Sequence, residues 1–195
     1  MPGLPIKPAV LTEIQRQFNH ELSAAHAYTA LAQWCAAQNL KGFARFFHKQ
    51  AGEEREHAQK FMDHLLDRGA MPELAAIPAP KTKFKNVLEV VQHAREMEQV
   101  NTAGIHQAYE AALAEKDYPA QVALQWFISE QVEEEAWCDE LVGRVEAANC
   151  AGGASAISMS PSPAASAAPG GWATSSCRHT ASGSVPNPKP RSRGT

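Results

Sequence analysis

The sequence predicts an all-α fold: a four-helix bundle with one long crossover between helices two and three, followed by a disordered C-terminal tail. Four long stretches place apolar side chains every three or four positions, which is the period of an α-helix. The first and third connections between them are short, whereas the middle one, residues 70–85, is long and holds three prolines. No segment shows a strand pattern that competes with these helical periods.

The first helix is expected over residues 8–39, where apolar residues recur at helical steps from Leu11 to Ala32. The second is expected over residues 42–67. Gly69 marks its end, because glycine readily adopts the backbone conformation that terminates helices.

The third helix is expected over residues 86–116. It opens at Asn86, whose side chain is suited to accept from the first free amides of a helix. Asp117 and Tyr118 form a short turn, and Pro119 opens a fourth helix that runs to about residue 148.

The middle connection is long enough to cross the bundle. Fully extended, it reaches roughly 50 Å at ~3.3 Å per residue. A helix of about 28 residues is only ~42 Å long at ~1.5 Å per residue. Helices two and three are therefore expected to run parallel, whereas one and two, and three and four, are antiparallel. This is the bundle topology with a single crossover.

The composition changes at the end of the fourth helix. We assign residues 1–149 to the bundle and residues 150–195 to a tail that is rich in Ala, Ser and Gly and holds six of the 13 prolines. Such a segment has too few large apolar side chains to offset its ordering entropy, so the tail is expected to be disordered.

Charge, signal and cysteine patterns exclude several classes. The tail carries four basic and no acidic residues. Since the whole chain has a net charge of −3, the bundle must be acidic, which suits the binding of cations rather than of nucleic acid. No apolar run is long enough for a membrane span, and the first ten residues do not form a secretory signal, so we expect a cytoplasmic protein. The four cysteines form no C-x-x-C pair, which excludes zinc knuckles and thioredoxin-like motifs and favours reduced thiols.

Glu54 and His57 are the strongest metal-ligand candidates. They are three residues apart, so both side chains leave one face of the second helix and could hold one transition-metal ion. Each other helix carries a possible partner, which is how four-helix bundles build two-iron sites, and oxygen ligands with one imidazole suit Fe(II). The partners are Glu21, Glu98, and the pair Gln131 and Glu134.

Ordinary structural roles compete with these assignments. EEREH and EQVEEE are charge runs, which are usually solvated helix faces, and Glu96 is an alternative to Glu98. Tyr28 fits either packing or a place beside the site. Trp126 and Trp137, like Trp34, are most simply core or groove-filling side chains.

Residues 1 to about 150 resemble a bacterial-type non-haem ferritin of the ferritin-like superfamily. The matching phrases fall on the expected helices in order: NHELSAAHAY, AGEEREHAQKFMDHL, MEQVNTA, DYPA and LQWFISEQVEEE. The resemblance implies one iron held by Glu21, Glu54 and His57, and a second held through bridging Glu54 with Glu98 and Glu134. It makes Gln131 either a ligand of the second iron or a close partner of its ligands. It further implies a third iron site at Glu53, Glu130 and Glu133, and flanking aromatics at Tyr28 and Trp126.

The resemblance also implies an activity. This is oxidation of Fe(II) by O₂ or H₂O₂, with Glu54 and Tyr28 as catalytic residues, and storage of ferric mineral in a shell of 24 identical subunits. No haem is expected, since Arg55 stands where bacterioferritins have methionine and Glu134 where they have a second motif histidine. The family's short fifth helix is replaced by AGGASAISMSPSPAASAAPGG, a frameshifted or divergent tail, so the sequence leaves closure of the shell open.

Three other functions stay open at this point. A rubrerythrin-like peroxide reductase would need an electron-donor module, for which the C-x-x-C pairs are missing. A shell subunit without useful oxidation would not need the full ligand set. A DNA-protecting mini-ferritin would place its metal site between subunits rather than among four helices of one chain.

Overall fold

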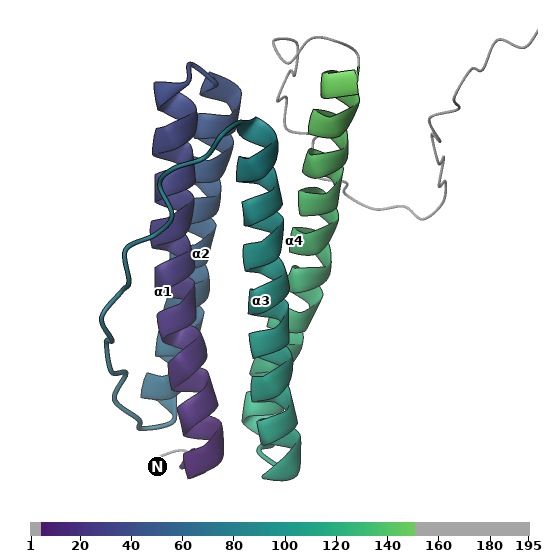
Figure 1. Ribbon diagram of the computed structural model, residues 1–195. Helices are drawn as coiled ribbons and strands as arrows, with labels where there is room; N and C mark the ends of the chain where they lie inside the picture. The colour runs from purple at the N-terminus through teal and green to yellow at the C-terminus, as the bar shows by residue number, and fades with distance from the viewer. Residues whose placement is uncertain (1–4, 151–195) are drawn as a thin grey trace, which may run out of the picture. The chain divides into compact units, whose positions relative to one another are not determined.

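The computed structural model describes residues 5–150. All regular secondary structure in this part of the chain is α-helical, as predicted. The four helices are α1 (Pro8–Ala37), α2 (Lys41–Asp67), α3 (Val87–Ala114) and α4 (Tyr118–Cys150). Figure 1 shows them as a bundle in which the connection after α2 runs back along its length, so that α2 and α3 point the same way. None of the described helices has the length and apolar character needed to cross a bilayer.

The helix ends follow the sequence signals closely. Asn86 Oδ1 accepts from the amide of Glu89 at 2.9 Å, which confirms the predicted cap of α3. Gly69 has a φ of +73° just after α2, where a side chain would be strained. Helix α1 ends two residues earlier than predicted, at Ala37, because Asn39 turns into the left-handed region with a φ of +60°.

Helix α4 is slightly longer than predicted at both ends. It begins at Tyr118, one residue before Pro119, and continues to Cys150, two residues past the expected end. Cys150 therefore lies in the helix and not in the predicted tail. The expected disorder of the tail concerns residues 151–195, which lie outside the described residues, so the division into a bundle and a tail stays a prediction.

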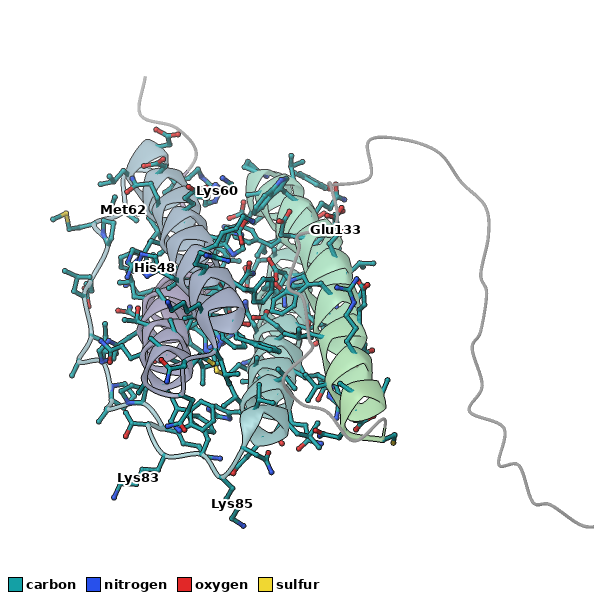
Figure 2. All side chains as sticks on the ribbon, turned by 90° about the horizontal axis from the view of Figure 1, so that it is seen from above. His48, Lys60, Met62, Lys83, Lys85 and Glu133 are labelled. Carbon is teal, nitrogen blue, oxygen red and sulfur yellow. The ribbon has the colours of Figure 1, made fainter. Side chains whose placement is uncertain are left out.

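Two apolar clusters fill the bundle, one toward each end. One gathers around Tyr28 and Phe47, and the other around Phe61 and Phe127. Figure 2 shows the bundle from above, with side chains filling the space between the helices. The residues between the two clusters along each helix are polar and buried, so the sequence places a polar layer in the middle of an apolar core.

Side chains hold the crossover against α1. Asn19 donates from Nδ2 to the carbonyl of Glu73 at 2.9 Å and accepts the amide of Ala75 on Oδ1 at 2.8 Å. Gln15 Oε1 accepts the amide of Glu73 at 3.0 Å. These bonds give the loop backbone partners that a long connection otherwise lacks.

Arg68 and Asp117 join the end of α2 to the start of α4. The guanidinium donates to both carboxylate oxygens, at 2.9 and 3.0 Å, and Asp117 is buried. Asp117 also accepts the amide of Ala120 at 3.2 Å and so caps α4. Although burial acts to raise the pKa of Asp117, these hydrogen bonds lower it overall.

Replacing Asp117 with alanine should lower the free energy of unfolding by about 3 kcal/mol, because it removes the buried carboxylate that pairs with Arg68 and also removes the cap of α4. Urea denaturation measures the loss. Asp139→Ala is the control: its carboxylate lies 3.6 Å from Arg95 on the surface, so its loss should cost less than about 1 kcal/mol. Equal losses in the two variants would show that the Arg68 pair contributes no more than a surface pair.

Candidate metal centre

The polar layer of the core receives at least one candidate ligand from every helix. The six side chains are each no more than 5% exposed, although their types normally face water. The interpretation of EEREH and EQVEEE as wholly solvated faces is therefore wrong for the members that point inward. The buried set comprises Glu21 from α1, Glu54 and His57 from α2, Glu98 from α3, and Gln131 and Glu134 from α4.

Glu21, Glu54 and His57 form the first group able to hold a metal ion. Their ligand atoms all lie within 4.8 Å of one another, and His57 Nδ1 is 3.2 Å from Glu54 Oε2. Atoms bound to one ion at ~2.1 Å each lie at most about 4.2 Å apart, so small side-chain movements would complete such a shell. The spacing of Glu54 and His57 on one helical face is what places both in this group.

His57 also belongs to a second group, with Glu130 and Glu134. Their ligand atoms again lie within 4.8 Å of one another, and Glu130 is half-buried. The resemblance assigned Glu130 to a third iron site with Glu53 and Glu133. Glu130 lies close to His57, Glu53 is half-buried and ion-paired with Lys49, and Glu133, labelled in Figure 2, is exposed, so the third site stays a prediction.

Glu98 lies beside these groups, with hydrogen bonds on both of its oxygens. The Tyr28 hydroxyl donates to Oε1, and Gln131 Nε2 donates to Oε2 at 3.2 Å. Tyr28 is fully buried in the apolar cluster, and its hydroxyl still reaches the Glu98 carboxylate. The same side chain therefore packs in the core and contacts a candidate ligand. Glu96, the alternative candidate, has a side chain that is 71% exposed, which leaves Glu98 as the inward carboxylate of α3.

Two buried amides that the sequence analysis missed hold Glu21. Gln17 Nε2 donates to Oε1 at 2.9 Å, and Asn101 Nδ2 donates to Oε2 at 3.3 Å. Gln17 also donates to Asn101, which joins α1 to α3 across the layer. Gln17 is four residues before Glu21 and Asn101 three after Glu98, so a search for amides at helical spacing from the candidate carboxylates could have found both.

A second pair of missed donors holds Glu134. Gln50 Nε2 donates to Glu134 Oε2 at 3.2 Å, and the Trp137 indole donates to the same oxygen. Trp137 was expected only to fill space, and it is three residues after Glu134 on the same face. Such donors orient a carboxylate, which in metal sites is as necessary as the ligands themselves.

Burial dominates the electrostatics of the layer. It raises the pKa of Glu21 and of Glu54 well above the usual range, and in each case a neighbouring carboxylate adds to the shift, Glu54 for Glu21 and Glu98 for Glu54. Burial, followed by the charge of Glu98, raises the pKa of Glu134 to about 8. Burial therefore favours the protonated forms of these groups in the absence of a cation, and a divalent ion would replace the protons and pair with the charged carboxylates.

Most of the chain matches a known protein family. The family model of the ferritin-like domain matches residues 11–148. The chain belongs to the ferritin family. The bacterial non-haem ferritin of Staphylococcus haemolyticus is 44% identical over 127 residues, which are 65% of this chain and 76% of that protein. A Staphylococcus aureus bacterial non-haem ferritin has the same identity over the same shares.

Solved ferritins share the fold. An open pore ferritin from Archaeoglobus fulgidus superposes with a TM-score of 0.72 at 33% identity, covering 73% of this chain and 87% of that one. Chlorobium tepidum ferritin gives the same TM-score at 29% identity, with shares of 74% and 88%. The resemblance to bacterial non-haem ferritins is therefore confirmed. Iron storage is the function class of this ferritin, and iron is the metal that its family implies.

Proposed function

We propose that this ferritin oxidises Fe(II) to Fe(III) at a two-iron centre within each subunit, with O₂ or H₂O₂ as the oxidant, and stores the ferric product in a homo-oligomeric shell. The observation that carries the proposal is the buried polar layer, in which four carboxylates, an imidazole and an amide from four helices lie together. Such a set is very costly to bury unless cations neutralise it. The position of the layer within one chain also favours a ferroxidase centre over the intersubunit site of a mini-ferritin.

The roles of the ligands follow from their contacts. Glu21, Glu54 and His57 would take the first Fe(II), since their ligand atoms already lie close together. Glu54 would bridge to the second Fe(II), which Glu134 and Glu98 would hold from the opposite side of the layer. Gln131 holds Glu98 through a hydrogen bond and could offer its own carbonyl oxygen as a ligand after a small rotation.

The protein contributes position and charge to the reaction. Two Fe(II) ions each lose one electron, and O₂ accepts both electrons with two protons to give H₂O₂. Bound Fe(II) displaces protons from the carboxylates, and the charged carboxylates then stabilise Fe(III) more strongly than Fe(II). Tyr28 would keep Glu98 oriented while that carboxylate binds iron, because its hydroxyl already donates to Oε1.

Glu130, Glu53 and Glu133 would serve iron that enters or leaves the centre. Glu130 lies within reach of His57, whereas Glu133, directly before the buried Glu134, is exposed. The carboxylates of this part of α4 range from buried to exposed. Their oxygens would bind Fe(III) in turn as it leaves the core. We keep these three residues as the proposed third site.

Iron oxidation followed by stopped-flow absorbance tests the proposal. Fe(II) added to the metal-free chain in air should show a fast phase whose amplitude saturates at about two Fe(II) per subunit, as a two-iron carboxylate site requires. A linear rise without saturation would mean that oxidation occurs on the mineral or in solution. In that case the chain would be a shell subunit without a centre of its own.

Light scattering tests the shell. We expect the full chain to form a closed particle of about 24 subunits. A chain truncated after Cys150 should form the same particle, because a closed symmetric shell depends on matching surfaces of the bundle, and both chains contain the whole bundle. Dimers for both chains would contradict the storage compartment. Dimers for the full chain alone would show that the residues beyond the bundle prevent assembly.

A further inference from the structure

Three buried amides form a chain of hydrogen bonds across the polar layer, from α1 through α3 to α4. Gln17, Asn101 and Gln131 are each at most 3% exposed. Gln17 Nε2 donates to Asn101 Oδ1, and Asn101 Nδ2 donates to Gln131 Oε1 at 3.4 Å. Each oxygen in the chain faces back toward α1, and each nitrogen faces onward toward α4. The chain therefore has a single direction of donation.

The amide nitrogens of this chain also donate to candidate ligands. Gln17 and Asn101 donate to the two oxygens of Glu21, at 2.9 and 3.3 Å. Gln131 donates to Oε2 of Glu98 at 3.2 Å. An amide turned the other way would place its oxygen against a carboxylate oxygen, and two acceptors repel each other. The direction of the chain therefore decides whether Glu21 and Glu98 are held in place or repelled.

Arg16 fixes this direction at the α1 end. A guanidinium can only donate, so the atom of Gln17 that faces it must be the amide oxygen. Arg16 Nη1 donates to Gln17 Oε1 at 3.2 Å, which leaves the amide nitrogen of Gln17 facing into the layer. Arg16 is itself held by the Glu13 carboxylate and by the carbonyl of Gly104, each at 2.8 Å. None of these three partners is a candidate ligand, so Arg16 would act on the metal centre through Gln17.

The opposite end of the chain agrees with the same direction. Gln131 Nε2 also donates to the hydroxyl of Thr102 at 3.1 Å, and that hydroxyl donates onward to Glu135 Oε1. An ionised carboxylate only accepts, so Glu135 keeps the Thr102 hydrogen directed away from Gln131. The chain thus begins at a group that only donates and ends at a group that only accepts. Both ends favour the same orientation of all three amides.

Gly104 on α3 leaves the space that the first bond of the chain needs. A β-carbon at this position would lie 2.7 Å from Gln17 Oε1 and 2.9 Å from Arg16 Nη1. Both distances are shorter than van der Waals contact, so a larger residue would displace the two side-chain ends that form this bond. Glycine is less favourable than alanine inside a helix, so the close approach gives a steric reason for a glycine here.

We propose that Arg16 is a positioning residue for the metal centre. By donating to Gln17 it fixes the direction of the amide chain, and the chain holds Glu21 and Gln131 in the orientation that metal binding requires. The inference rests on the proposed two-iron function, because it concerns the affinity of the same site. Replacing an outer partner of a metal ligand typically weakens metal binding by about 10–100-fold. Arg16 acts one residue further out, so we expect an effect of about tenfold.

Titration of the metal-free full chain with Co²⁺ tests the proposal without iron oxidation. Co²⁺ stands in for Fe(II) as a nearby divalent ion of the same series. Calorimetry gives the dissociation constant, and visible absorbance reports coordination. Arg16→Met should weaken binding about tenfold, whereas Arg16→Lys, which keeps a side chain that only donates, should restore most of the loss. Arg144→Met is the matched control and should bind as the wild type does: the Arg144 side chain is 43% exposed against 38% for Arg16, and it also pairs with a glutamate of its own helix.

A double-mutant cycle shows whether Arg16 acts through Gln17. Gln17→Met keeps the length of the side chain but removes the amide, and it should weaken Co²⁺ binding about tenfold or more. In that background Arg16→Met should cause no further loss, because residues that act through one another are not additive. Gly104→Ala should weaken binding in the wild-type background and not beside Gln17→Met, while circular dichroism shows that the helices are intact.

The outcomes separate the role of Arg16 from the metal centre itself. The role is overturned, and the two-iron centre is unaffected, if Arg16→Met binds Co²⁺ as the wild type does, if Arg144→Met shows an equal loss, or if the losses in the double variant are additive. The centre falls, and this role with it, if the wild-type chain shows no tight Co²⁺ binding or if tight binding survives Glu54→Ala.

Discussion

Replacing Glu54 with alanine should reduce the fast phase of iron oxidation at least 100-fold. Glu54 is the proposed bridge between the two irons, and it shares a group of mutually close ligand atoms with Glu21 and His57. Without it, two Fe(II) ions can no longer be held at the spacing of about 3.5–4 Å that two-metal chemistry uses. Stopped-flow absorbance of the ferric product measures the effect, and a rate equal to that of the wild type would show that the site is assigned wrongly.

Glu56→Ala is the matched control for this experiment. Glu56 lies on the same helix, two residues further on, but is exposed. Its replacement changes the net charge by the same amount and should leave the fast phase unchanged. A loss of rate in both variants would indicate a general effect of surface charge on iron arrival.

The metal-free protein should lose stability as the pH rises from 4.5 to about 8. Glu134 has an ordinary pKa of 4.5 when unfolded and a pKa of about 8 in the folded chain, so folding favours its protonated form. This contribution to stability is complete below pH 4.5 and is lost as the pH approaches 8. Each pKa unit corresponds to ~1.4 kcal/mol, so the loss attributable to Glu134 is about 3–5 kcal/mol.

Glu134→Gln isolates this contribution, because glutamine cannot ionise. Urea denaturation at pH 5.5 and pH 8.5 should show that the variant loses less stability than the wild type over this interval. Glu133→Gln, a change at the exposed neighbour, should follow the wild type. Anaerobic Fe(II) at pH 8.5 should restore wild-type stability, since an ion that binds only the folded chain stabilises it by mass action. If all three chains show the same pH dependence, Glu134 titrates normally.

Helical spacing was sufficient to find the inward carboxylates. Val91 and Ile105 stand seven positions to either side of Glu98 and so share its helix face, and the structure buries Glu98 while Glu96 remains in solvent. The same reasoning placed Glu54 and His57 on one face. Side chains that leave a helix in one direction must be buried together once that face packs, so the period alone decides which candidates enter the core.

Spacing along one helix could not show which groups meet between helices. The bond from Tyr28 to Glu98 joins residues 70 positions apart, and the bond from Gln50 to Glu134 joins residues 84 apart. Glu130 on α4 lies near His57 on α2, a contact that the spacing of neither helix shows. These contacts depend on the axial shifts and rotations of the helices against one another, which cannot be read from the sequence of any one helix.

By itself, the sequence determined the four helices, the cap of α3, the single crossover and the set of candidate ligands that face the core. Each of these follows from a local preference or from a periodicity that one helix carries alone. Only the tertiary structure decided the donors that orient Glu21 and Glu134 and the position of Glu130 beside His57. Those features are set by how side chains from different helices fill a shared space, and that packing is a property of the assembled bundle.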